Sequence, residues 1–172
     1  MIRMVRWSIL GAVAALTASA AVAQAAPAPD HTDVVVGMSD DHPMMSKAFK
    51  RARAELDDFL KVARAPAAHQ SDFAVKVGLH DGEGTEYVWI SDFAEDARGN
   101  FSGVINNEIE IVTKYKLGDT YRFTRTDIVD WLYFDSRETR MYGNYTMCAL
   151  LTQEPAEQAE AMKKQFKLDC AL

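Results

Sequence analysis

The chain has 172 residues, a formal net charge of −6 at pH 7, and 48% hydrophobic residues. This composition is typical of a globular protein and argues against disorder. The acidic balance argues against a nucleic-acid partner, because phosphate binding needs clustered lysine and arginine.

The first 25 residues predict a secretory signal peptide. Arg3 and Arg6 form a basic start, residues 7–22 form an uncharged apolar run, and small residues follow at alternate positions. Signal peptidase recognises this order of parts, and a retained anchor needs ~20 predominantly apolar residues, usually large ones. We expect cleavage after Ala23 or Ala25, a periplasmic or secreted protein, and no membrane span after signal removal. Removal takes away two arginines, so the mature charge is 17 − 25 = −8.

Residues 26–41 predict a flexible leader, and residues 42–172 a single α+β domain. The domain opens with a helix, because apolar residues recur at three- and four-residue steps from Met45 to Ala63. Asp41 is the predicted N-cap of this helix, and Pro43 suits its first turn.

From residue 73 the apolar period changes to two, which predicts antiparallel strands joined by short loops. Strands are expected at residues 73–80, 85–90, 101–105, 109–113, 121–124, 132–134 and 141–151, with one helical turn at 127–131. A final helix follows Pro155 and ends at Cys170. The expected fold is therefore α+β. A long N-terminal helix packs on a curved antiparallel sheet of about five or six strands, or a partly open barrel, with a C-terminal helix added.

The chain has 2 cysteines, and in an exported protein two cysteines usually pair. Cys148 falls in the last predicted strand, and Cys170 ends the helix that follows it. If that helix folds back over the sheet, the two thiols can meet. We predict a Cys148–Cys170 disulfide, which stabilises the fold by ~3 kcal/mol on the chain-entropy model. The alternative is two unpaired thiols.

No motif of known chemistry is present. The sequence contains no serine elbow, no phosphate-binding loop and no zinc-protease helix motif. His31 with Asp33, and Asp40 and Asp41 with His42, could in principle hold a metal, but the ligand spacing of a known site type is absent. We therefore expect neither a metal nor another cofactor.

Two carboxylates stand beside tryptophans, Asp92 close to Trp89 and Asp130 next to Trp131. Paired carboxylates can do acid–base chemistry if one is desolvated, so Asp92 and Asp130 are the catalytic candidates. The competing interpretation is that both acids cap turns while the tryptophans fill the core. Trp89, Trp131 and Tyr87 form the candidate binding surface.

A series of short motifs resembles a known family. In chain order the main ones are Ala52-Arg-Ala-Glu-Leu56, Glu86-x-x-Trp-Ile-Ser-Asp92, Phe101-x-Gly-Val-Ile-Asn-Asn-Glu108, Lys116-x-Gly-Asp119, Ile128-x-Asp-Trp131 and Gly143-Asn-Tyr-Thr146. Over residues 44–152 they resemble the YegJ-like family of bacterial proteins, a domain of unknown function; the terminal helix lies outside the resemblance. The resemblance implies a bacterial protein, for which the predicted export would mean the periplasm or beyond, and it carries over no catalytic residue.

The first hypothesis for function is a non-catalytic binding or interaction module in the periplasm, whose unidentified partner could be an envelope protein. Two alternatives stay open. One is a small hydrolase-like enzyme that uses Asp92 and Asp130, and the other is an envelope structural or stress-related protein. An enzyme predicts a deep pocket where the two acids converge, whereas a binding module predicts a shallow exposed aromatic patch.

Overall fold

The computed structural model describes residues 38–82 and 84–172, so the predicted signal peptide and residues 26–37 of the predicted leader lie outside the described residues. In chain order its elements are α1 (Pro43–Arg64), β1 (Gln70–His80), β2 (Thr85–Glu95), β3 (Asn100–Ile105), β4 (Thr120–Thr124), a 3₁₀ turn (Arg125–Asp127), β5 (Ile128–Asp135), β6 (Arg140–Gly143), α2 (Tyr145–Leu150) and α3 (Ala156–Phe166). Among these residues no helix is both long and apolar enough to span a membrane.

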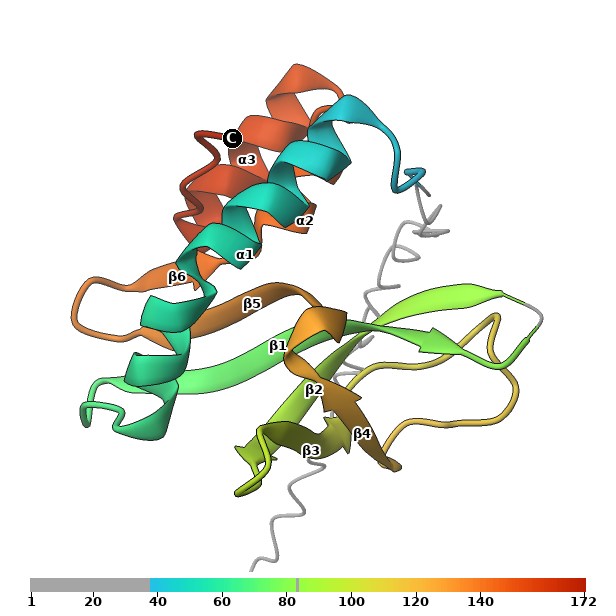
Figure 1. The fold of residues 1–172 in the computed structure, drawn as a ribbon. Coiled ribbons are helices and arrows are strands. Elements are labelled where there is room, and N and C mark those ends of the chain that lie inside the picture. The colour runs from blue at the N-terminus through green and yellow to red at the C-terminus, as the bar shows by residue number, and fades with distance from the viewer. Residues whose placement is uncertain (1–37, 83) are drawn as a thin grey trace, which may run out of the picture. The chain divides into compact units, whose positions relative to one another are not determined.

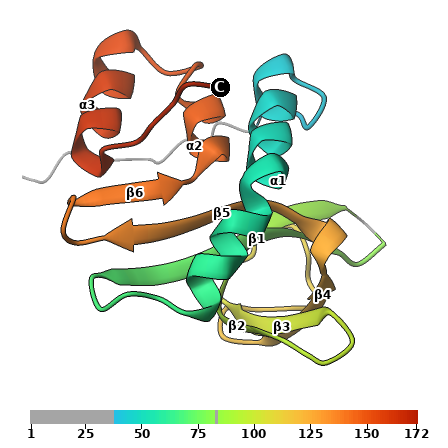
Figure 2. The ribbon, with the colours of Figure 1, turned by 60° about the vertical axis from the view of Figure 1, so that its left-hand side comes forward.

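The strands form one six-stranded antiparallel sheet in the order β4-β3-β2-β1-β5-β6. The α+β prediction is confirmed. The sheet is not closed into a barrel, because β4 and β6 are its two edges. The chain runs through β1 to β4 as a meander and then returns to place β5 against the other side of β1. Figure 2 shows α1 crossing the curved sheet, with α2 beside its N-terminal half and α3 on the far side of α2, and Figure 1 shows the three helices from another side.

Helix α1 packs through the apolar stripe that the sequence predicts. Its buried residues are Met45, Ala48, Phe49, Ala52, Leu56, Phe59 and Leu60. The indole Nε1 of Trp131 in β5 donates to the carbonyl of Ala52 at 2.9 Å, which ties the helix to the sheet. The predicted N-cap is wrong: Nδ1 of His42 accepts the N–H of Met44, while Asp41 accepts the hydroxyl of Ser39.

The strand predicted at residues 141–151 is wrong after Gly143, where α2 begins. Gly143 and Asn144 both have left-handed backbone, with φ of 75° and 56°, and this reverses the chain. A Cβ on Gly143 would lie 2.1 Å from the carbonyl oxygen of Trp131, so only glycine fits there. The carboxylate of Asp130 then accepts the N–H groups of Tyr145 and Thr146, which start the helix.

The strand predicted at residues 109–113 is also wrong, and its place is taken by a loop. The N–H groups of Glu110, Ile111 and Val112 donate to the carboxylate of Glu86 at 2.8–3.1 Å, so no neighbouring strand is needed to satisfy them. A side chain on β2 thus replaces the ladder partner that the alternating pattern implied.

The helical turn predicted at residues 127–131 lies earlier, at Arg125–Asp127. The Asp127 carboxylate accepts the N–H and the hydroxyl of Thr124. Asp127 therefore ends this turn, whereas the sequence predicted that it begins one. The backbone is extended from Ile128 onward, and β5 takes over the residues that were assigned to the turn.

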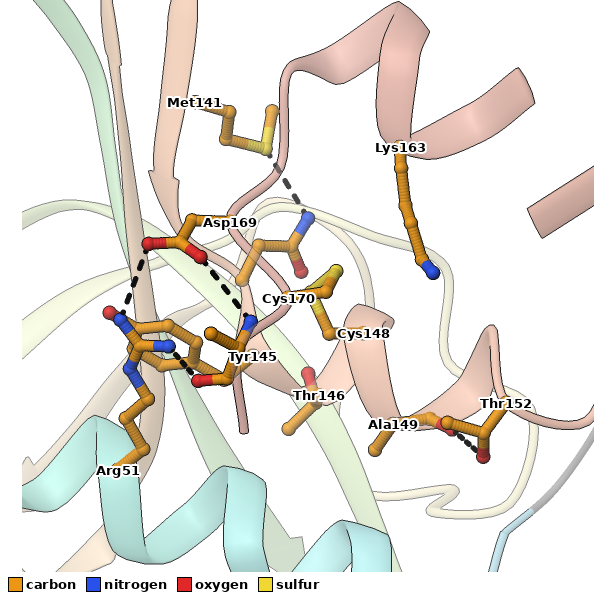
Figure 3. The surroundings of a disulfide bond; sticks show 12 residues. Arg51, Met141, Tyr145, Thr146, Cys148, Ala149, Thr152, Lys163, Asp169 and Cys170 are labelled. Carbon is orange, nitrogen blue, oxygen red and sulfur yellow. Dashed lines mark hydrogen bonds and ion pairs between the residues drawn. A yellow bond between two sulfur atoms is a disulfide. The ribbon is translucent and has the colours of Figure 1, made fainter. Parts of the chain in front are cut away.

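The predicted disulfide between Cys148 and Cys170 is present (Figure 3). Its two cysteines come from elements other than those expected. Cys148 lies in α2 and not in a strand, and Cys170 lies in the segment that follows α3, which ends at Phe166. The bridge therefore joins the end of the described chain to the short helix that Asp130 starts.

Candidate functional site

Two neighbouring strands carry a β-bulge at corresponding places. The pairing of β1 with β5 shifts between Ser71 and Ala74, and the pairing of β2 with β3 shifts between Ser91 and Ala94. Since Ala74 pairs with Ser91, the two bulges lie side by side. Bulges re-aim side chains and occur often beside functional sites.

The same tripeptide, Ser-Asp-Phe, builds both bulges, at residues 71–73 and 91–93. Asp72 and Asp92 hold its middle position in left-handed backbone, with φ of 57° and 48°. Non-glycine residues seldom adopt this conformation, and aspartate tolerates it better than most. Each bulge therefore turns one carboxylate out of the regular alternation of its strand.

Gly103 on β3 makes room for the second bulge. A Cβ at this position would lie 2.5 Å from Cγ2 of Ile90, 2.7 Å from the carbonyl oxygen of Ser91 and 2.9 Å from Cβ of Phe93. No other residue can stand there unless the bulged strand moves. The close approach of β3 thus fixes the backbone on either side of Asp92.

The two bulges form a wall of a cavity of about 530 Å³. Polar and aromatic groups line it together, among them Asp72, Phe73, Trp89, Asp92, Phe93 and Asn106. Both carboxylates are exposed to solvent, and the three aromatic rings are half-buried. Apolar walls with a few placed polar groups are the usual composition of a ligand pocket.

The two carboxylates differ in their partners. Oδ2 of Asp72 accepts the hydroxyl of Ser71 at 2.8 Å. Within the described residues, the carboxylate of Asp92 has neither a hydrogen bond nor an ion pair. An exposed anion beside aromatic rings can receive a cation through both charge and ring contact.

A buried polar cluster lies behind Trp89. The ammonium of Lys76 sits 4.6 Å from the centroid of the Trp89 ring and donates to Oγ1 of Thr146 at 2.8 Å. Oγ1 of Thr146 donates in turn to Oδ2 of Asp130, also at 2.8 Å. Asp130 is 0% exposed and further accepts the N–H groups of Trp131, Tyr145 and Thr146.

Burial dominates the titration of this cluster. It raises the pKa of Asp130, although the donors on Thr146, the Lys76 ammonium and the N–H of Trp131 act in the opposite direction. Burial likewise lowers the pKa of Lys76, against the attraction of Asp130. Every acceptor site of Asp130 faces a donor of its own chain, so its carboxylate serves to join β5 to α2.

The structure separates the two predicted catalytic acids. Asp92 and Trp89 both line the cavity, whereas Asp130 and Trp131 do not. Trp131 is 5% exposed and packs in the core. Tyr87, the third residue of the predicted binding surface, donates its hydroxyl to Asp40 at 2.6 Å and does not line the cavity.

Sequence reasoning missed Asp72, Phe73 and Phe93 as cavity residues. The available signal was the repeated Ser-Asp-Phe tripeptide, because two identical turn-forming inserts in two adjacent strands indicate two equivalent bulges. Of the metal-ligand candidates, His31 and Asp33 lie outside the described residues. Residues 38–82 and 84–172 hold no group of three or more histidine, cysteine, aspartate or glutamate side chains that could bind a metal ion.

Comparison with known proteins gives a family but no function. Residues 42–170 match the family model described as "Uncharacterized protein conserved in bacteria (DUF2314)". The chain is 36% identical over 135 residues to the uncharacterized protein YegJ of Escherichia coli (strain K12), which covers 78% of this chain and 85% of that protein. No solved structure matches the chain. The family match extends beyond the region of the sequence resemblance, because it also includes α3 and Cys170.

Proposed function

Because the chain belongs to the bacterial family DUF2314, whose description assigns no activity, we propose a function from its own geometry: a non-catalytic binding module that works outside the cytoplasm. Its ligand site is the cavity between the bulges of Asp72 and Asp92. The ligand is an organic cation with an apolar body.

The observation that carries this proposal is the convergence of two Ser-Asp-Phe bulges on one cavity. Each bulge interrupts a strand ladder and holds an aspartate at positive φ, which costs about 1 kcal/mol or more. The phenylalanines of the two bulges pack on Phe59, with ring centroids 6.2 and 6.0 Å away, which offsets part of this cost, but this packing does not use the two aspartates. Strain of this kind persists mainly where the surrounding structure uses it to present a side chain.

The chemistry of the walls indicates the ligand class. Asp72 and Asp92 supply negative charge, and the mature chain of the predicted export product is acidic as a whole at 17 − 25 = −8. Phe73, Trp89 and Phe93 supply ring surface for an apolar body, and the two phenylalanines also for cation–π contact, since the Lys76 ammonium already lies over the Trp89 ring. A neutral ligand of the same shape would use only the rings, so its affinity would be lower.

Two features support a place outside the cytoplasm. The N-terminal sequence has the basic start, apolar run and small-residue sites of a signal peptide. The Cys148–Cys170 disulfide is of a kind that persists in oxidising compartments and is rare in the cytosol. N-terminal sequencing of the protein recovered from the cell envelope would check this: we expect a start at Gln24 or Ala26, and a start at Met1 would contradict export.

A hydrolytic use of Asp92 and Asp130 would require both acids at one reacting centre. The donors around Asp130 leave it engaged within the core, and it does not line the cavity that Asp92 lines. This separation favours binding over catalysis as the role of the site.

Binding is tested by following amide resonances of the protein during titration with benzylamine and with its neutral counterpart benzyl alcohol. We expect benzylamine to shift residues of the cavity wall, and to bind more tightly than the alcohol. The variant Asp92→Asn removes the charge while keeping a side chain that tolerates positive φ. It should weaken benzylamine binding about tenfold, which corresponds to ~1.4 kcal/mol for one ion pair next to aromatic groups.

The matched control is Asp58→Asn, the same charge change on the exposed face of α1. It should leave benzylamine binding unchanged. The proposal fails if the two ligands bind equally, or if Asp58→Asn weakens binding as much as Asp92→Asn does.

A further inference from the structure

A second and smaller cavity, of about 210 Å³, lies where α1, β6, α2 and the segment after α3 meet. Two arginines line it, Arg51 from α1 and Arg140 from β6, together with Tyr142, Tyr145 and Asp169. Figure 3 shows Asp169 beside the Arg51 guanidinium, next to the Cys148–Cys170 disulfide. None of these residues lines the cavity between the bulges.

Both guanidinium groups are held in place by aromatic rings. Cζ of Arg51 lies 4.5 Å from the ring centroid of Tyr145, and Cζ of Arg140 lies 4.7 Å from that of Tyr142. The Tyr145 hydroxyl and Nε of Arg51 both bond to Glu55, which fixes the first pair further. Positioned guanidinium groups lose little freedom when they bind an anion.

Asp169 is an incomplete ligand for this pair. A single oxygen, Oδ2, faces both arginines, at 3.6 Å from Arg51 and 3.4 Å from Arg140. Strong arginine–carboxylate pairs are bidentate, with nitrogen–oxygen distances of about 2.7–2.9 Å. Nε of Arg140 is buried and has no hydrogen-bond partner among residues 38–82 and 84–172. The two guanidinium groups therefore have N–H donors that Asp169 does not engage and that a better-placed carboxylate would use.

The segment that carries Asp169 follows α3, of whose residues only Ala159 is buried. It is held by the disulfide at Cys170, by the Arg51 bond to the carbonyl of Ala171, by the ion pairs of Asp169, and by the Lys167 bond to the carbonyl of Glu138. Leu172 also packs against the hydrophobic core. Covalent linkage at the next residue keeps Asp169 at a high effective concentration next to the arginines.

We propose that Arg51 and Arg140 form a carboxylate-binding site, that Asp169 occupies it as an internal ligand, and that the Cys148–Cys170 disulfide keeps it occupied. A dithiol opens the site by exchange. One of its thiolates attacks a disulfide sulfur, the S–S bond breaks, and a mixed disulfide forms, which the second thiol of the reagent then displaces. The dithiol is oxidised to a cyclic disulfide, and both cysteines leave as thiols. A carboxylate from another molecule can then replace Asp169.

The test measures citrate binding by calorimetry on the purified full chain, with inorganic phosphate at equal ionic strength as the comparison anion. In the disulfide-bonded form, Asp169→Asn should strengthen citrate binding at least about tenfold, since it removes a tethered competitor present at an effective millimolar concentration. Reduction with dithiothreitol should give a similar gain. Adding Arg140→Gln to Asp169→Asn should abolish it.

Glu160→Gln is the matched control, because it removes one carboxylate from α3 at a distance from the arginines. It should leave citrate binding unchanged. Asp169→Asn keeps the disulfide, so it tests the site even if reduction unfolds the protein. No gain in Asp169→Asn, or a gain that survives Arg140→Gln, overturns the proposal. Phosphate binding as tight as citrate binding overturns the assignment to carboxylates.

Discussion

Two aspartates of this protein stand beside tryptophans in sequence and do opposite work in the structure. Asp130 pairs with Lys76 of β1 next to a register shift, is 0% exposed, and accepts four donors of its own chain. Asp92 sits on a bulge, is exposed, and has no partner among the described residues. The fold therefore uses Asp130 to join β5 to α2 and presents Asp92 at a cavity.

The largest effect should come from removing the charge of Asp130. Asp130→Asn leaves the Lys76 ammonium buried without its counter-charge and turns an amide toward backbone donors. We expect the free energy of unfolding to fall by about 3–5 kcal/mol in a urea titration. Adding Lys76→Met should recover part of the loss, because no lone charge then stays buried. If Asp130→Asn lowers the free energy of unfolding by less than about 1 kcal/mol, then Asp130 supports the fold no more than Asp92 does.

A smaller effect is expected where the bulge of Asp92 is supported from β3. Gly103→Ala places a Cβ 2.5 Å from Ile90 and 2.7 Å from the Ser91 carbonyl oxygen, so β2 or β3 must shift. We expect a loss of about 1–3 kcal/mol in unfolding free energy. Amide shifts should change around residues 90–94 more than around Asp130. Equal changes at both places would mean that the bulge is not an independent feature.

At Asp92 itself the expected change in stability is about 1 kcal/mol and depends on the replacement. Asp92→Ala should destabilise by this amount, because alanine tolerates positive φ poorly. Asp92→Gly should be neutral or stabilising, since glycine adopts φ of 48° without strain. Thermal unfolding of both variants measures the difference. Destabilisation by glycine as large as that by alanine would show that the carboxylate supports the fold.

The smallest effect concerns Glu86, a half-buried acid between these two extremes. Burial acts to raise its pKa, but the N–H groups of Glu110, Ile111 and Val112 lower it overall. The contact with the loop is therefore complete above the ordinary glutamate pKa of ~4.3 and is lost as pH falls below it, through the lower value of the folded state.

Amide resonances of residues 110–112, followed from pH 7 to pH 3, measure this loss. They should move only below about pH 4.3, and Glu86→Gln should remove that pH dependence. A midpoint of the resonance change above pH ~4.3 would mean that the pKa of Glu86 is raised and not lowered. The experiment compares Glu86 with Asp92, which has no partner in the part of the chain that the structure describes, and with Asp130, which accepts four donors.

The sequence predicted the parts of the fold that repeat a pattern. The apolar stripe of α1 and the alternation in β1, β2 and β3 each depend on many residues, so single exceptions do not hide them. The disulfide followed from the compartment that the N-terminus implies. The N-cap was assigned to the acid at position 41 because aspartate is the commoner cap, yet the imidazole of His42 fills that role.

The failures come from side chains that replace backbone partners over long distances in the chain. Glu86 satisfies a loop that looked like a strand, and Asp130 starts a helix, α2, whose sequence is typical of a strand. Events of the same kind separate the two candidate acids. The sequence grouped Asp92 and Asp130 as paired carboxylates. In the structure a bulge turns Asp92 toward the cavity, and Asp130 instead accepts the N–H groups that begin α2. No local propensity encodes either event.

The position of β1 between β2 and β5 has a consequence for the growing chain. When the polypeptide emerges N-terminus first, β1 and β2 can pair as a hairpin before residues 128–135 exist. Until β5 docks, β1 offers an open edge with Val75, Val77 and Leu79 along it, the kind of edge to which other extended segments add. Docking of β5 covers this edge, and we expect it to be a late folding step because it closes a long loop.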